Sequence, residues 1–180
     1  SAPELFVVKH VEPLDRNVSA WGYDMAQDPQ LRRAIGDAVN GGRPVLAGPM
    51  QPLPDEKSAA GFVYLVPVYQ RGADPLSGPV KNVVLKGLLF AEMVAAGLME
   101  GVVDAADGKL DLDLFDGDSV KTGKLVFDAD VQERITANGQ GSAMGAGRMF
   151  EASRMLEIGG RKLLLHVSTT SEFEADIDRS

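Results

Sequence analysis

Hydrophobic positions along this chain recur with two spacings, which separate one clear helix from several strands. In residues 29–41 apolar side chains recur every three or four positions, as on one face of an α-helix. Asp28 and Pro29 form a strong helix start, because the aspartate can accept from first-turn amides and proline suits the first helical position. The NGG sequence beginning at Asn40 ends the helix, since glycine readily adopts the left-handed conformation there.

Runs of β-branched and aromatic residues predict strands in the first half of the chain. A short strand-like run comes first, and three longer ones follow. These are residues 6–8, 43–49, 61–70 and 80–90. Pro67 predicts an edge position or a bulge, because proline cannot donate to a strand ladder. The polar segments 50–60 and 71–79 are predicted loops, and residues 91–103 have helical composition.

Strand patterns dominate the second half. Leucine alternates with aspartate in KLDLDLFDGD, residues 109–118, as in a half-buried strand followed by a tight turn. We therefore expect Asp111, Asp113 and Asp116 to face solvent or lie in the turn. A further strand follows in KLVFDAD, and after a Gly-rich connector at 135–147 residues 148–174 give two more, joined by the hairpin turn EIGGRK. The whole order predicts an α+β fold with mostly antiparallel sheet, as two sheet units in series.

Composition narrows the function. The 180 residues fit one domain or two small subdomains. A net charge of −8 argues against a nucleic-acid partner, because neutralising phosphates needs a basic face. The absence of cysteine excludes disulfides, thiolate metal sites and a cysteine nucleophile. No run approaches the roughly 18 apolar residues of a membrane span.

Catalytic and metal motifs are also missing from the pattern. GQGSAMG resembles a nucleophile elbow only loosely and lacks the strand before it. In DLDLFDGD the acidic residues fall out of the EF-hand register, with Asp116 where that loop requires glycine. The two histidines, His10 and His166, belong to no recognisable triad or ligand cluster. We expect a domain that is not an enzyme and holds no metal or cofactor.

Asp24 raises a separate question, because a carboxylate stands among Trp21, Tyr23 and Met25 just before the helix. One interpretation is a solvated group, or one paired with Arg32 or Arg33. The other is a pocket acceptor whose apolar neighbours form walls around a ligand donor. Both remain open from the residues alone.

Several motifs together resemble the CHASE family of extracytoplasmic sensor domains. They are VKHVEPLDRN, WGYDMAQDPQLRRAIGDAVNGGRPVLAGP, GFVYLVPVY, LKGLLFAEMV and LDLFDGD, in family order from about Val7 to about Thr170. The resemblance implies two tandem PAS-like subdomains, at 1–97 (membrane-distal, ligand-binding) and 98–180 (membrane-proximal). It also implies an N-terminal stalk helix, missing from this sequence, between flanking membrane helices that are likewise absent here.

The resemblance assigns site residues as well. Asp24 of GYDMA matches the aspartate that accepts hydrogen bonds from the adenine of the hormone in plant cytokinin receptors. Leu46 of PVL matches the leucine that lends backbone contacts, and Tyr64, Val66 and Gly87 would border the pocket. Gly41 replaces a threonine of the plant pattern, and the loop at 51–60 has no match for a second one. These two departures count against cytokinin itself, while Asp24 would suit any small ligand with N–H donors, such as a purine-like compound, or with a positive charge.

These assignments predict a ligand sensor in the periplasmic or extracellular part of an inner-membrane receptor. Its output would be a diguanylate cyclase, a phosphodiesterase or a histidine kinase, in a full-length homodimer. The alternative is a ligand-free structural dimerisation module of such a receptor.

Overall fold

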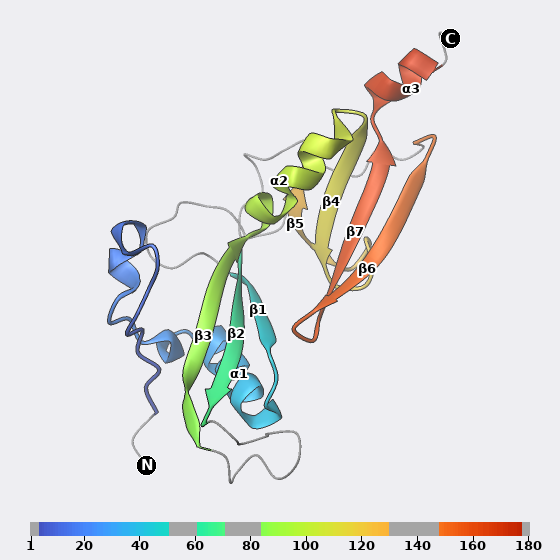
Figure 1. Ribbon diagram of the computed structural model, residues 1–180. Coiled ribbons are helices and arrows are strands. Elements are labelled where there is room, and N and C mark those ends of the chain that lie inside the picture. Colours follow the sequence, from blue (N-terminus) through green and yellow to red (C-terminus); the bar gives the residue numbers. More distant parts are fainter. Residues whose placement is uncertain (1–3, 51–60, 71–83, 130–147, 178–180) are drawn as a thin grey trace.

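The protein is described by a computed structural model that covers residues 4–50, 61–70, 84–129 and 148–177. The loops predicted at 50–60 and 71–79 and the connector at 135–147 lie outside these ranges, except for Met50, which belongs to a strand. Two antiparallel sheets stand one after the other, with strand orders β1-β2-β3 and β5-β4-β7-β6 (Figure 1). The predicted α+β class with two sheet units is therefore confirmed, while the PAS-like character of each unit and a stalk helix remain predictions.

The first unit is a three-stranded sheet with helix α1 packed on one face. Its strands are β1 (Val45–Met50), β2 (Gly61–Tyr69) and β3 (Leu85–Val94), and the helix is α1 (Pro29–Gly41). Asp28 caps α1 by accepting hydrogen bonds from Gln30 N (2.6 Å) and Leu31 N (3.0 Å). Gly42 ends it at φ 62°, as the NGG pattern predicted. The buried stripe of α1 packs on Val63 and Leu65 of β2, together with Val8 and Met25.

The second unit is a four-stranded sheet reached through helix α2 (Ala95–Ala106). Its strands are β4 (Leu110–Asp116), β5 (Lys124–Asp128), β6 (Glu151–Ile158) and β7 (Arg161–Thr169). Both Leu/Asp-rich strands, β4 and β5, belong to this sheet, as predicted. A short helix, α3 (Ser171–Ile177), follows β7 at the end of the molecule farthest from the first sheet (Figure 1).

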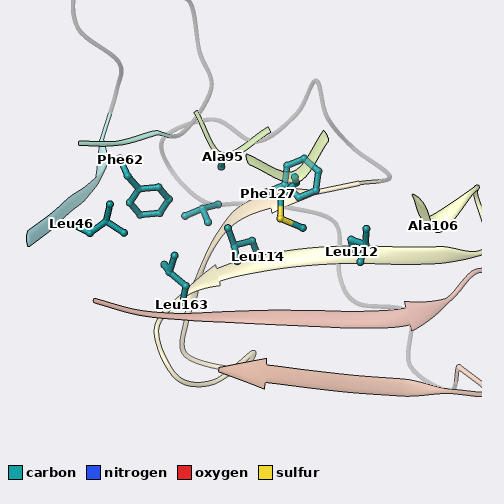
Figure 2. Packing of buried hydrophobic residues seen from close by; sticks show 10 residues of the cluster. Leu46, Phe62, Ala95, Ala106, Leu112, Leu114, Phe127 and Leu163 are labelled. Atoms are coloured by element: carbon teal, nitrogen blue, oxygen red, sulfur yellow. The ribbon is translucent and has the colours of Figure 1, made fainter. Parts of the chain in front are cut away.

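One hydrophobic cluster joins the two units. Leu46 and Phe62 of the first sheet pack in the same cluster as Leu114 and Leu163 of the second (Figure 2). Ala95 and Ala106 of α2 complete it, so the linking helix contributes to the shared core. The interiors of the two sheets are therefore continuous rather than separated by a solvated linker.

Two local predictions differ from the structure and a third agrees with it. β3 continues to Val94, so α2 begins at Ala95 rather than at residue 91, because residues 91–94 pair with β2. Residues 171–174 are helical, not part of the last strand. The prediction for Pro67 agrees with the structure: β2 is the central strand, but its pairing with β1 ends at Leu65, so Pro67 has an open edge on that side, and a register irregularity follows between Val68 and Tyr69. No helix in the described ranges is long and apolar enough to span a membrane.

Candidate functional site

Asp24 is buried and hydrogen-bonded to the backbone. It is 7% exposed, and its Oδ1 accepts from Phe6 N at 2.9 Å and from Ala26 N at 3.1 Å. An isolated bridge between Val7 and Asp24 adds a backbone tie to the same segment. Within the described ranges it forms no ion pair with Arg32 or Arg33. Its carboxylate thus satisfies amides of two segments, a role that neither sequence interpretation included.

The other four predicted site residues share one face of the first sheet. Leu46 pairs with Tyr64, and Gly87 lies opposite Val68, two positions beyond Val66 along β2. Residues two apart on a strand, and directly paired residues, point to the same face. Since Val63 and Leu65 of the alternate set pack against α1, this shared face is turned away from α1.

Asp24 does not join that face. Its neighbour Met25 packs with the α1-side cluster, and Tyr23 lies partly buried against the same cluster. Trp21, the remaining predicted wall, is 61% exposed. The structure therefore brings Leu46, Tyr64, Val66 and Gly87 together on the sheet and keeps Asp24 in the N-terminal segment beside it.

A groove of about 990 Å³ runs between that N-terminal segment and β3. One wall is residues 5–13 with Asn17, Ala20 and Met25, and the other is residues 85–92 with Val94. Gly87 is the member of the predicted set that lines it. A volume of this size is typical of small-molecule pockets. Asp24 does not line the groove, but its bond to Phe6 N anchors the wall formed by residues 5–13.

The direction of the backbone groups at this groove follows from the sheet register. Leu46 N donates to Gly159 O at 3.1 Å, so the backbone groups of Leu46 point away from β2. In an antiparallel pair the N–H and C=O of one residue point to the same side, and the side alternates along the strand. The backbone groups of Val45 therefore point to its partner Leu65 on β2. Those of Tyr64, and of every second residue along β2 from it, point to β3.

The same alternation continues across β3. Tyr64 is paired with Ala91 and Val66 with Leu89, so these two β3 residues turn their amides and carbonyls to β2. Leu88 and Phe90 then present theirs along the groove, at the edge of β3 that pairs with no other strand in the part of the chain that the structure describes. Unpaired edge groups of this kind can hydrogen-bond a bound molecule.

Charged side chains of both signs surround the groove. Lys9 and Lys86 are cationic, Glu12 and Glu92 are anionic, and His10 stands beside Lys9. Leu5, Val8 and Phe90 add apolar lining, so the groove offers mixed polar and apolar contacts. The sequence analysis did not predict that the N-terminal segment lines a groove. The available signal was the apolar, strand-like run from Phe6 to Val8, which is followed directly by the basic residues Lys9 and His10.

The second unit carries a polar row across its sheet. Asp128, Asp113, His166 and Ser153 are consecutive cross-strand partners on β5, β4, β7 and β6. Ser153 Oγ and His166 Nδ1 are 2.9 Å apart. Asp113 is only 8% exposed, so the expectation that it faces solvent is wrong. The Leu/Asp alternation correctly predicted a strand. The face of β4 that carries the aspartates is nevertheless also covered, beside a small cluster of Phe115, Leu125 and Leu164.

Carboxylates gather at one point of this row. Oxygens of Asp111, Asp113 and Asp128 lie within 4.8 Å of one another, and none of the three residues is without a partner. Oxygens at this spacing are hard ligands of the type that divalent cations use. Asp116, the third residue expected in solvent, is half-buried and accepts from Arg161 Nε (2.6 Å) and Nη2 (2.7 Å).

Two titratable groups are shifted by their surroundings. Burial raises the pKa of Tyr69, whose hydroxyl donates to Val39 O at 2.9 Å and ties β2 to α1. The pKa of Glu174 is lowered, first by the hydrogen bond from the Thr169 hydroxyl and then by the amide of Met149. Both groups are structural ties, and neither lies in the groove.

Comparison with known proteins agrees with this architecture. The sequence model of the CHASE domain matches residues 1–127, from the N-terminal wall of the groove into β5. The motif resemblance extended to about Thr170, so the stretch after residue 127 is not part of the match. No curated protein matches the chain. The chain belongs to the CHASE domain family, non-catalytic, extracytoplasmic sensor domains of signalling receptors that bind small-molecule ligands.

Proposed function

We propose that this chain is the small-molecule sensor of a transmembrane receptor and that its first unit holds the ligand. In this proposal residues 1–97 are the membrane-distal binding subdomain and residues 98–180 the proximal one. The receptor is an inner-membrane homodimer that carries a diguanylate cyclase, phosphodiesterase or histidine kinase output. The domain itself performs no chemistry.

The groove beside β3 is the observation that carries the ligand site. It lies within the part of the chain that matches the family, and its volume of about 990 Å³ suits a small organic molecule. The edge groups of Leu88 and Phe90 supply donors and acceptors, and the two lysines and two glutamates supply charges of both signs. These features favour a small ligand with adjacent donor and acceptor groups, such as a purine-like or other N–H-donating compound.

Asp24 acts on the ligand through this wall or directly. Asp24 does not line the groove and its Oδ1 already accepts two backbone amides, so a ligand N–H would reach only its second oxygen, and only if residues 5–13 moved aside. Of the predicted sheet residues, Gly87 lines the groove, whereas Leu46, Tyr64 and Val66 lie farther across the same face, so their part in ligand binding stays a prediction. Asp24→Asn keeps an oxygen acceptor and removes the charge. It should weaken a cationic or N–H-donating ligand by about tenfold to a hundredfold, the value of a charge-assisted hydrogen bond.

The ligand-free alternative has one observation in its favour. Leu46 and Phe62 are buried in the core shared with the second unit, where they fill space rather than leave a cavity. A structural dimerisation module would use this face of the sheet as packing alone. It would bind no small molecule at the groove.

A thermal-shift screen against purines, amino acids and amines tests the proposal. A compound that binds only the folded state raises the melting temperature by mass action. Gly87→Leu is the matching variant, because a side chain added at Gly87 meets no atom within 4 Å and would occupy the groove instead. Gly101→Leu on α2 is the control, since a side chain added there also meets open space and Gly101 does not line the groove.

The expected result is at least one compound that stabilises the wild type and Gly101→Leu but not Gly87→Leu. Two results would defeat the groove assignment. One is a compound that stabilises all three proteins equally, and the other is a screen in which no compound of these classes shifts the wild type.

A further inference from the structure

The turn between β6 and β7 reaches across to the first unit. Figure 1 shows this hairpin extending from the second sheet to lie beside β1. At its tip Gly159 O accepts a hydrogen bond from Leu46 N at 3.1 Å. Leu46 uses an amide that points outward from the first sheet, so the hairpin occupies an edge position beside β1.

The fit at this contact leaves no room for a side chain. A Cβ added at Gly159 would lie 2.5 Å from Leu46 N, 2.9 Å from Val45 C and 3.1 Å from Tyr64 Cε2. Gly159 and Gly160 both have positive φ, 54° and 72°, so the turn itself demands glycine-like backbone at both. A Cβ at Gly160, in contrast, would meet nothing within 4 Å. Of the two glycines, it is therefore Gly159 whose missing side chain allows the close approach to β1.

The base of the hairpin is fixed to the second unit. The Arg161 guanidinium donates to both carboxylate oxygens of Asp116, at 2.6 and 2.7 Å, in a bidentate pair that is largely shielded from solvent. Gly117 N donates to Lys162 O at 3.1 Å beside it. The turn is therefore carried rigidly by β4 and β7.

Strand β7 connects the turn to the far end of the molecule. Its nine residues span about 30 Å at the usual rise of about 3.3 Å per residue. It ends at Thr169, whose hydroxyl donates to Glu174 of α3. Glu174 N in turn donates to Thr170 O at 3.1 Å. One continuous strand thus links the edge of the first sheet to helix α3.

We propose that the β6–β7 turn is a latch that couples the position of the first sheet to the direction of β7 and α3. The latch has a docked arrangement, with Gly159 on Leu46, and a released one. A ligand that binds one arrangement more tightly than the other shifts the docked–released equilibrium, and the size of the shift is set by the difference between the two affinities. In this signalling role the latch rests on the proposed sensor function, whereas the contact itself can be tested without a ligand.

Amide hydrogen exchange, followed by NMR on the ligand-free protein, tests the docked contact. The Leu46 amide should be protected in the wild type and in Gly160→Ala. In Gly159→Ala it should exchange at least tenfold faster, while the buried amide of Ile35 in α1 stays protected. Rapid exchange of Leu46 in the wild type, or equal acceleration in both glycine variants, would overturn the latch.

A second variant covers the case in which Gly159→Ala does not fold. Arg161→Met removes the bidentate pair with Asp116 at the base of the hairpin and leaves Gly159 in place. It should accelerate Leu46 exchange severalfold and leave Ile35 unchanged. An unaltered Leu46 rate in a folded Arg161→Met protein would contradict the proposal.

Spin-label distances test the coupling itself. The chain has no cysteine, so labels at Asp37→Cys on α1 and Glu172→Cys on α3, both exposed, are unique. Double electron–electron resonance should give one narrow distance distribution in the wild type and in Gly160→Ala, and a broader one in Gly159→Ala. A broad wild-type distribution, broadening shared by Gly160→Ala, or no broadening in Gly159→Ala would each overturn coupling. Because no ligand is used, this outcome is independent of the thermal-shift screen.

Discussion

The two sheets are stabilised in different ways. The first has a helix of its own, α1, which packs on one face and closes a local core around Leu31 and Ile35. The second packs its inner face against α2 and against Leu46 and Phe62 of the first unit. The first unit can therefore keep its fold while its free edge and groove remain open to a ligand. The second unit depends on contact with the first, which suits a part that responds to it.

The distribution of buried polar groups deepens the contrast. Among the residues that the structure describes, the first unit buries one such side chain, Asp24. The second buries five: Asp113, Asp128, His166, Ser168 and Thr169. Buried polar groups require specific partners, because an unpaired one costs free energy. The second sheet is thus specified by polar pairs as well as by packing.

The largest effect should come from the shared core. Phe62 is fully buried at the boundary of the two units, so Phe62→Ala should lower the free energy of unfolding by about 3–5 kcal/mol. Both units should lose stability together. Urea denaturation followed by circular dichroism and by Trp21 fluorescence measures this, and the two transitions should coincide.

Ile35→Ala in the local core of α1 is the comparison variant. It should cost about 2–5 kcal/mol, and Leu114 and Leu163 of the second sheet keep their packing partners. If Phe62→Ala destabilised only the Trp21 signal, the core would not be shared. The second sheet would then not depend on contact with the first, contrary to the difference described above.

A second effect should be confined to the N-terminal wall. Asp24→Ala leaves the amides of Phe6 and Ala26 without their acceptor, at about 1–3 kcal/mol for each group that stays buried. Asp24→Asn should cost much less, because its oxygen can accept the same two bonds. Equal losses in the two variants would show that charge, rather than backbone anchoring, is what Asp24 provides to the fold.

A smaller effect is expected at the start of α1. Asp28→Ala removes the acceptor for Gln30 N and Leu31 N, so it should cost about 1 kcal/mol. Since the two units share a core and unfold together, β7 amides should lose protection only by this global amount, whereas amides in the first turn of α1 should lose more. An equal fall in both would contradict a local role for the cap.

The smallest effect is a pH dependence at the junction of β7 and α3. The lowered pKa of Glu174 means that its contribution to stability is present above the ordinary glutamate value of 4.5 and is lost as the pH falls through the lowered value. Because the group is solvent-accessible, the change should be slight. Melting temperatures between pH 3 and 6 should show it in the wild type and not in Glu174→Gln; identical profiles would contradict it.

Local signals in the sequence predicted much of the fold. The Asp28-Pro29 start and the NGG end determined α1, and hairpin glycines located β6 and β7, because caps and turns are decided by neighbours in the chain. The end of β3 was harder to predict. Residues 91–94 have helical composition but pair with β2, and pairing overrides local propensity.

The candidate site depended on contacts distant in sequence. Asp24 was identified as unusual, but the amide of Phe6 that it holds is 18 residues away. The contact of Gly159 with Leu46 joins segments more than a hundred residues apart. The spacing of hydrophobic residues predicts helices and strands but cannot predict such a distant pair. Burial of Asp113 likewise depends on what covers the second face of β4, which an alternating pattern cannot reveal.

The most direct test of the account is a deuterium-exchange footprint of the compound that gives the largest shift in the thermal screen. Exchange read by mass spectrometry, with and without that compound, reports where it binds. The account predicts the strongest protection in residues 5–13 and 85–94, the two walls of the groove, with no direct protection of β4 or β5. Protection confined to residues 110–128, or none in the first unit, would contradict a ligand site beside β3.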